Sequence, residues 1–225
     1  MRLLVVSALL ASAALAQPPA PSEIVAHAGD DAWRPIAPAD LLVLELRPLA
    51  RGKPRRVVIQ LMPPPFSQSW VGNVRRLAAA HWWDGLTVNR VQENYVVQWG
   101  DPLGDDPAKA KPLPPGLVKV AAADYVAPVP RAWGAPGDGG SDAPALQGVL
   151  PLRDAYAAHV GVTPDGWPFA TDGSADWPVH CFGMVGVGRD LPPDTGSGAE
   201  LFVVNGHAPR HLDRNLALVG RVIDG

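Results

Sequence analysis

The chain has 225 residues, enough for one domain of generous size with a full hydrophobic core. It carries 19 basic and 22 acidic side chains, a formal net charge of −3, with no Lys/Arg cluster on any predicted element, so we expect no nucleic acid as a partner. Cys181 is the only cysteine, which excludes an internal disulfide and leaves core packing as the source of stability.

The first sixteen residues have the features of a secretory signal peptide. Arg2 supplies a positive start, residues 3–13 form a short apolar core, and residues 14–16 (ALA) are a small-residue cleavage site. The apolar run is shorter than the roughly 20 residues that span a bilayer, so we expect cleavage rather than a membrane anchor. The expected mature protein begins at Gln17, is periplasmic or secreted, and has no stable membrane insertion. Residues 17–39, rich in Pro and Ala, predict an extended lead-in.

A single domain is predicted over residues 40–225. Two compact apolar segments, residues 41–46 and 56–62, flank the turn-forming stretch ARGKP and predict a β-hairpin. Residues 67–81 then place apolar side chains three to four positions apart, which predicts an amphipathic helix with Ser67 or Ser69 as its N-cap. The residues of its predicted buried face are Trp70, Val74, Leu77 and His81.

From residue 86 to residue 99 the period of the hydrophobic pattern becomes two. Leu86, Val88 and Arg90 are expected on one face of a strand, and a second strand follows a turn at residues 92–94. Residues 103–179 lose this periodicity, so they predict a loop-rich insertion outside the core, with room for one short helix or strand.

Short apolar pieces return after residue 180 as CFGMVGV, ELFVV and LALVGRVI, each bounded by Gly, Pro or Asp. Short strands on both sides of one definite helix predict an all-β fold with one or two capping helices. The simplest such fold is a closed antiparallel barrel that carries a long loop insertion.

Two blocks of sequence carry a resemblance to a known family. The first block is VNR at residues 88–90, a turn, and then YVVQWGD at residues 95–101; the second holds GSGAELFVV and HLDRNLALVGRV. These stretches resemble the F-x-R, F-M-x-Q-x-G-D, G-S-Q-F-F-I and W-L-D-G-x-x-x-x-F-G-x-V motifs of the cyclophilins, the peptidyl-prolyl cis/trans isomerases. The resemblance implies a cyclophilin-like barrel that needs no cofactor or metal. It also implies substrates that are proline-containing segments of unfolded or newly exported proteins.

The resemblance implies roles for ten residues. Arg90 and Gln98 would be the catalytic pair, at the nitrogen and at the carbonyl oxygen of the rotating X-Pro bond. The implied substrate-binding residues are Tyr95, Val96, Val185, Gly186, Glu200, Phe202, His211 and Leu212. Tyr95, Val96, Phe202 and Leu212 would form the apolar seat of the proline ring, whereas Val185 and Gly186 would offer main-chain contacts.

The sequence departs from the family pattern inside this implied site. Val96 stands for a methionine, Glu200 for a glutamine, His211 for a tryptophan and Leu216 for a histidine. A carboxylate at Glu200 is expected to pair with Arg90, either fixing its orientation or competing for its donors. These departures keep open a second function, a module that binds Pro-containing peptides but turns them over feebly.

The family usually continues beyond the position of Gly225 with a segment that closes the barrel. Two possibilities follow: the sequence is a truncated record, or a lead-in strand near Leu41 takes that place.

Other residues allow chemistry of a different class, but their spacing argues against it. His207 and His211 are four apart, yet Pro209 forbids the helix that would bring them together on a metal, and a metal-dependent hydrolase has no credible ligand set. Cys181 follows His180 directly, and adjacent strand residues point to opposite faces, so we expect a buried structural cysteine rather than a nucleophile. Arg90 by itself would suit a solvent-facing strand position, and its functional interpretation depends on Gln98 in family register.

Overall fold

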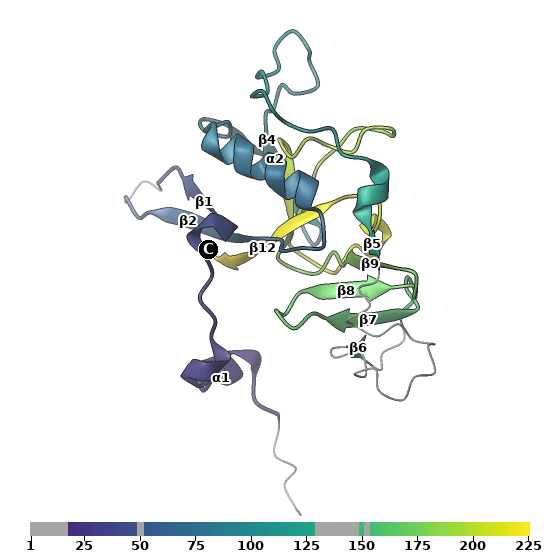
Figure 1. The fold of residues 1–225 in the computed structure, drawn as a ribbon. Helices are drawn as coiled ribbons and strands as arrows, with labels where there is room; N and C mark the ends of the chain where they lie inside the picture. Colours follow the sequence, from purple (N-terminus) through teal and green to yellow (C-terminus); the bar gives the residue numbers. More distant parts are fainter. Residues whose placement is uncertain (1–17, 49–51, 129–148, 151–153) are drawn as a thin grey trace, which may run out of the picture. The chain divides into compact units, whose positions relative to one another are not determined.

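In the computed structural model, the described residues are 18–48, 52–128, 149–150 and 154–225 (Figure 1). The signal peptide predicted over residues 1–16 lies outside them. The described residues form two compact units, which meet in the sequence between Ile36 and Ala37. No helix of the described part has the length and apolar character needed to cross a bilayer.

The first unit holds the helix α1 (Pro21–Ala26) and the 3-10 turn η1 (Asp30–Ala32), and neither contains a buried residue. Pro21 occupies the start of α1, where its fixed φ suits a helix and its missing N–H has no intrahelical partner to lose. The Glu23 carboxylate accepts the Ala20 N–H at 2.8 Å. The predicted extended lead-in therefore contains local helical structure, although it buries nothing.

Among the described residues of the second unit, seven strands form an antiparallel sheet in the order β1-β2-β12-β10-β11-β4-β3. Their bounds are β1 Leu41–Leu46, β2 Arg55–Leu61, β3 Thr87–Gln92, β4 Val96–Gly100, β10 Met184–Val187, β11 Leu201–Val204 and β12 Leu218–Asp224. The predicted hairpins β1–β2 and β3–β4 and the predicted strands after residue 180 are confirmed. β1 and β3 are the two ends of this strand order, so closure of the sheet into a barrel stays a prediction.

The helix α2 (Gln68–Ala79) confirms the predicted amphipathic helix. Trp70, Val74 and Leu77 are fully buried, and the Trp70 indole donates to the carbonyl of Thr195 at 3.1 Å. His81 does not belong to this face: it lies after the helix with φ of 51° and an exposed side chain, because the chain turns away at the helix end. Ser67 is the N-cap residue, but its side chain makes no capping hydrogen bond.

The segment 103–179 is more ordered than its sequence predicts. Its described residues form a second antiparallel sheet in the order β5-β9-β8-β7-β6. The bounds are β5 Ala127–Pro128, β6 Val149–Leu150, β7 His159–Val162, β8 Pro168–Thr171 and β9 Ala175–Pro178, with the 3-10 turn η3 at Ala122–Tyr125. Trp167 and Phe169 belong to the same buried cluster as the main sheet. The expectation that this segment lies outside the core is therefore wrong, since strands of two to four residues are too short to show a period of two.

Candidate active site

Four side-chain positions form a row across the main sheet. Gly186 of β10 pairs with Phe202 of β11, Phe202 pairs with Gln98 of β4, and Gln98 pairs with Arg90 of β3. Directly opposed residues of antiparallel strands project from the same face of a sheet. The register therefore brings Arg90 and Gln98 to one face, above Phe202, as the family resemblance implies.

A β-bulge in β3 aims Arg90 at this face. Val88 pairs with Trp99 and Arg90 with Gln98, so Asn89 is an extra residue between two consecutive partners. Because of this insertion, Val88 and Arg90 point to opposite faces. The expected common face for Val88 and Arg90 is therefore wrong, since strict alternation cannot include a bulge. The bulge also lets Asn89 reach the site: its Nδ2 donates to Glu200 Oε1 at 3.1 Å.

The row lies beside a cavity of about 150 Å³. Six of the ten predicted site residues line it, both members of the predicted catalytic pair and all four of the predicted seat: Arg90, Gln98, Tyr95, Val96, Phe202 and Leu212. Val96, Phe202 and Leu212 are 3–7% exposed, so the floor of the cavity is well packed. Gly188, Arg189 and Leu216 complete the lining.

Gln98 joins Arg90 to Glu200 through hydrogen bonds. Arg90 Nη1 donates to Gln98 Oε1 at 3.4 Å, and Gln98 Nε2 donates to Glu200 Oε1 at 2.8 Å. A guanidinium can only donate and a carboxylate can only accept, so the carboxamide satisfies both neighbours in this one orientation. The expected direct pair between Glu200 and Arg90 is not formed; Glu200 acts on Arg90 through Gln98. The second N–H of the Gln98 carboxamide stays available for a ligand.

Glu200 fits here because two glycines flank it. A Cβ at Gly100 would lie 2.1 Å from Glu200 Oε2, and a Cβ at Gly188 would lie 2.7 Å from Glu200 Cγ. Both contacts are too short for any side chain. The two glycines thus create the space that holds the carboxylate against Gln98.

Besides Gln98, two side chains contact the Arg90 side chain at the rim of the cavity. Its Nη2 donates to Gln92 Oε1 at 2.5 Å, and its guanidinium carbon lies 5.5 Å from the centre of the Tyr95 ring, within range of a cation–π contact. Tyr95 stacks on His211 with ring centres 6.2 Å apart. His211 thus supports the wall of the cavity from outside and does not line it.

Gly186 and Val185 have roles that differ from the expected main-chain contacts. β10 has paired strands on both sides, so both residues lie inside the sheet and neither lines the cavity. Val185 is fully buried in the core. A Cβ at Gly186 would lie 2.2 Å from Cζ of Phe202, so the absence of a side chain at Gly186 is what allows the Phe202 ring to lie flat across β10.

A buried ionic group supports the Phe202 ring and the turn that carries Leu212. His180 is fully buried, stacks on Phe202 with ring centres 6.0 Å apart, and its Nδ1 lies 2.9 Å from Asp213 Oδ1. Arg210 Nε donates to Asp213 Oδ2 at 2.6 Å, and its Nη1 pairs with Asp154. Leu212 of the turn η5 (Arg210–Leu212) is thereby held at the edge of the cavity.

The protonation state of this group follows from its burial. Burial lowers the pKa of His180 and outweighs the opposing effect of Asp213. Burial alone would raise the pKa of Asp213, but hydrogen bonds from His180 and Arg210 lower it overall. His180 Nε2 has no hydrogen-bond partner in the described part of the chain, which agrees with a neutral ring that donates from Nδ1.

Metal and thiol chemistry find no support in the described ranges. No three His, Cys, Asp or Glu side chains converge there as ligands would. His207 Nδ1 contacts the Asn94 carboxamide at 3.1 Å. Burial raises the pKa of the Cys181 thiol, which makes it a poor nucleophile at neutral pH.

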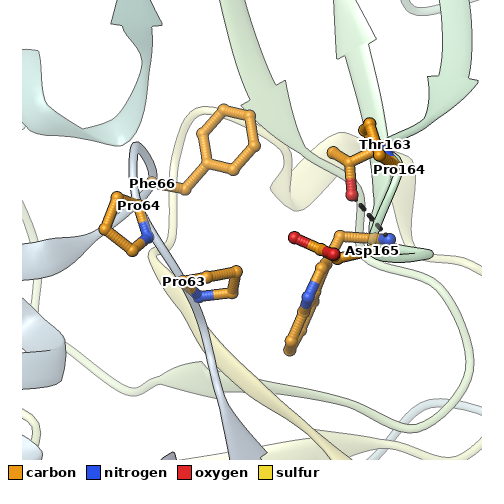
Figure 2. Close-up of a pocket in the computed structure, with 7 residues that line it drawn as sticks. Pro63, Pro64, Phe66, Thr163, Pro164 and Asp165 are labelled. Carbon is orange, nitrogen blue, oxygen red and sulfur yellow. Dashed lines mark hydrogen bonds between the residues drawn. The ribbon is translucent and has the colours of Figure 1, made fainter. Parts of the chain in front are cut away.

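A second cavity, of about 170 Å³, lies between the loop after β2 and the turn between β7 and β8 (Figure 2). Its lining residues are Pro63, Pro64, Phe66, Thr163, Pro164, Asp165 and Trp167. None of the residues that line it is a cation, and its one charged side chain is the Asp165 carboxylate. We therefore place the candidate active site at the cavity with Arg90, because of these two cavities in the described part of the chain it is the one that joins an arginine and a carboxamide to an apolar floor.

Known proteins resemble this chain in sequence and in fold. A sequence model described as "Cyclophilin type peptidyl-prolyl cis-trans isomerase/CLD" matches residues 55–225. Among solved structures, the chain is similar to cyclophilin AquaCyp293 from Hirschia baltica, with a TM-score of 0.58 and 21% identity over 86% of this chain and 67% of that chain. It is also similar to a Cryptosporidium parvum cyclophilin type peptidyl-prolyl cis-trans isomerase crystallised with the dipeptide Ala-Pro, with a TM-score of 0.40 and 12% identity over 76% and 73% of the two chains. No curated protein matches the chain.

Proposed function

The chain belongs to the cyclophilin-type peptidyl-prolyl cis/trans isomerase family, and we propose that its cavity catalyses rotation about X-Pro bonds with Arg90 and Gln98 as the polar pair. The observation that carries the proposal is the row Arg90, Gln98 and Phe202 on one face of the sheet, beside a cavity with an apolar floor. The proline ring occupies this cavity against Val96, Phe202 and Leu212.

Arg90 lowers the barrier by binding the twisted amide better than the planar one. Rotation about an X-Pro bond is opposed by a barrier of about 18–20 kcal/mol because it breaks the conjugation of the amide. As the bond twists, its nitrogen regains a lone pair that can accept a hydrogen bond, and the Arg90 guanidinium donates to it. This interaction is weak in the planar ground state, so it accelerates the reaction. No covalent bond is made or broken, and no proton is transferred.

Gln98 holds the carbonyl oxygen of the rotating bond. Its Nε2 keeps one hydrogen for the substrate because Glu200 accepts only the other. The carboxylate also polarises the carboxamide, since a hydrogen bond to a charged acceptor is stronger than one to a neutral acceptor. Glu200 is thus a positioning residue in this proposal, and Asn89 donates a second hydrogen bond to the same carboxylate oxygen.

The proposed substrates are proline-containing segments of unfolded or newly exported proteins in the periplasm or outside the cell. The support for export comes from the sequence of residues 1–16, with its basic start, apolar core and small-residue cleavage site. N-terminal sequencing of the protein recovered from a bacterial periplasm checks this part of the proposal. A mature N-terminus at Gln17 is expected, and an uncleaved Met1 in the cytoplasm would contradict it.

A second function is favoured by specific contacts of the site. One donor of Gln98 is held by Glu200 and one Arg90 nitrogen by Gln92, so fewer donors face the cavity than the two side chains could offer. A domain of this kind could bind Pro-containing peptides with little turnover. Binding without acceleration of exchange is the result that would favour this function.

Exchange NMR on a short Ala-Pro peptide separates the two functions. The wild-type chain is expected to accelerate cis/trans exchange, and Arg90→Ala is expected to lose most of this acceleration. Arg76→Ala serves as a matched control, because Arg76 is an exposed arginine of α2 that does not line the cavity. Equal acceleration by the wild type and Arg90→Ala would refute the proposed catalytic role.

A further inference from the structure

The cavity is lined by a second arginine that rotation of the X-Pro bond does not use. Arg189 follows β10 and lines the cavity together with Arg90, whereas none of the lining residues is acidic. We propose that Arg189 is a specificity-determining residue that selects substrates with an acidic side chain about three to four residues from the proline. This inference rests on the proposed function and names the class of peptide on which it acts.

The strand order places the two arginine residues at opposite ends of the cavity. Arg90 belongs to β3, Arg189 follows β10, and the strands β4 and β11 lie between them. Neighbouring strands are about 4.8 Å apart, so the two backbones are separated by about 14 Å. An extended peptide advances about 3.3 Å per residue. A peptide with its rotating bond at Arg90 therefore brings a side chain about three to four residues away to the end of the cavity at Arg189.

The Arg189 side chain is held in place before a ligand arrives. Its Nε donates to the Asn215 carbonyl at 3.1 Å, its Nη2 to Asn215 Oδ1 at 2.5 Å, and its Nη1 to the Asp190 carbonyl at 2.5 Å. The side chain is only partly exposed. Because its position is already fixed, little side-chain entropy is lost when it binds a carboxylate.

The charge of Arg189 is not neutralised by an ion pair. Its acceptors at Asn215 and Asp190 are neutral oxygens, the Tyr125 hydroxyl also lies close to it, and no carboxylate lies within ion-pair distance of it in the described part of the chain. Asp190 and Asp194 belong to the same loop, but neither lines the cavity, and Asp194 accepts the Asp190 N–H at 2.9 Å. Glu200 is occupied by Gln98 and Asn89. A carboxylate supplied by the substrate therefore meets Arg189 without a competing acid in the cavity lining.

The test is a charge scan of Ala-Pro peptides with Glu, Gln or Lys at each of the three positions before and after the Ala-Pro pair. The measured quantity is the ratio of kcat/KM for the Glu peptide to that for the Gln peptide, by exchange NMR, with the ratio of affinities taken from titrations of the same samples. We expect a ratio of about two- to fivefold at one position or at neighbouring positions, the range of a partly exposed ion pair. Because both peptides are measured on one protein sample, a loss of folded protein cancels from the ratio.

The variants separate a role in selection from a purely structural role. Arg189→Gln is expected to bring the ratio to one, Arg189→Lys to keep part of the preference, and Arg189→Glu to invert it in favour of the Lys peptide. Arg76→Gln makes the same change in net charge outside the cavity and is expected to leave the ratio unchanged. In 1 M salt, where the Debye length is about 3 Å, the wild-type preference is expected to shrink.

Two outcomes overturn the inference: no preference for Glu at any position in the wild type, or the same preference in Arg189→Gln. A wild-type protein without turnover on any peptide contradicts the proposed function instead. In that case the affinity ratios still decide whether Arg189 selects acidic peptides.

Discussion

Replacing Gly186 by alanine tests the floor of the site, because the added methyl group has no room beneath the Phe202 ring. The new Cβ would lie 2.2 Å from Cζ and 2.7 and 2.8 Å from the two Cε atoms of Phe202, whereas carbon atoms pack at about 3.5–4.0 Å. The ring must therefore move by more than about 1 Å. Gly186 has no left-handed backbone, so the effect is one of space alone.

The direction of this movement follows from the neighbours of the ring. His180 stacks on one part of Phe202 and is itself fully buried, so it resists displacement, while the cavity is open. We expect the ring to shift into the cavity, where it displaces the proline. The expected cost in the free energy of unfolding is about 1–3 kcal/mol, as for other overpacked cores. The expected loss in kcat/KM is about a hundredfold, the effect of a 1 Å misplacement in an active site.

The assay combines exchange NMR on the Ala-Pro peptide with urea unfolding of the same protein. Gly72→Ala is the matched control: it adds the same methyl group to α2, where only the flexible end of Arg76 lies nearby at 3.2 Å. This control is expected to keep the wild-type turnover and to gain about 0.5–1 kcal/mol from helix propensity. A Gly186→Ala protein with wild-type turnover and wild-type stability would refute the assignment of Phe202 as the seat.

Two further predictions concern the groups that support the site. Glu200→Gln is expected to lower kcat only a few-fold, because a neutral oxygen can still accept a hydrogen bond from Gln98. Glu200→Ala releases the Gln98 carboxamide and is expected to lower kcat by about tenfold, as for the loss of a charge-assisted hydrogen bond. Equal kcat in the wild type and both variants would contradict the positioning role of Glu200. The pKa of His180 and that of Asp213 are both lowered in the folded state, so the unfolded chain binds more protons in acid. The free energy of unfolding is therefore expected to fall as pH drops below about 6.5, because of His180, and again below about 3.9, because of Asp213. Urea unfolding between pH 7.5 and pH 5 measures the first step, which His180→Phe should reduce; a wild-type protein that becomes more stable over this interval contradicts the neutral buried ring.

The sequence predicted best those features that depend on period and register. The helix α2 shows its apolar spacing over three turns, and the β3–β4 hairpin shows alternating residues on both sides of a clear turn. Arg90 and Gln98 stand out because they are polar residues at family spacing beside an apolar pattern. Their meeting on one face required the pairing of the two strands, which the hairpin turn fixes.

The features that the sequence could not predict are those set by long-range packing. The bulge at Asn89 cannot be predicted from one strand alone, because a bulge is defined by two residues of one strand that oppose a single residue of its partner. Arg189 lies in a stretch rich in glycine and proline that shows no hydrophobic period. Its position beside the cavity depends on its hydrogen bonds to Asn215, which is distant in the sequence. Trp167 and Phe169 lie in strands too short for a pattern, so their place in the main core depends on contacts across the fold.

The central claim is that Arg90 binds the twisted amide in preference to the planar one, and the most direct test compares two losses in one variant. Exchange NMR gives kcat/KM of Arg90→Ala for the Ala-Pro peptide, and a titration of the same sample gives the affinity of the variant for that peptide. We expect kcat/KM to fall by about 10²- to 10³-fold, as for the loss of one preorganised donor, while the affinity changes by less than about threefold. An equal loss in kcat/KM and in affinity would contradict the claim, because it would mean that Arg90 binds the ground state as tightly as the transition state.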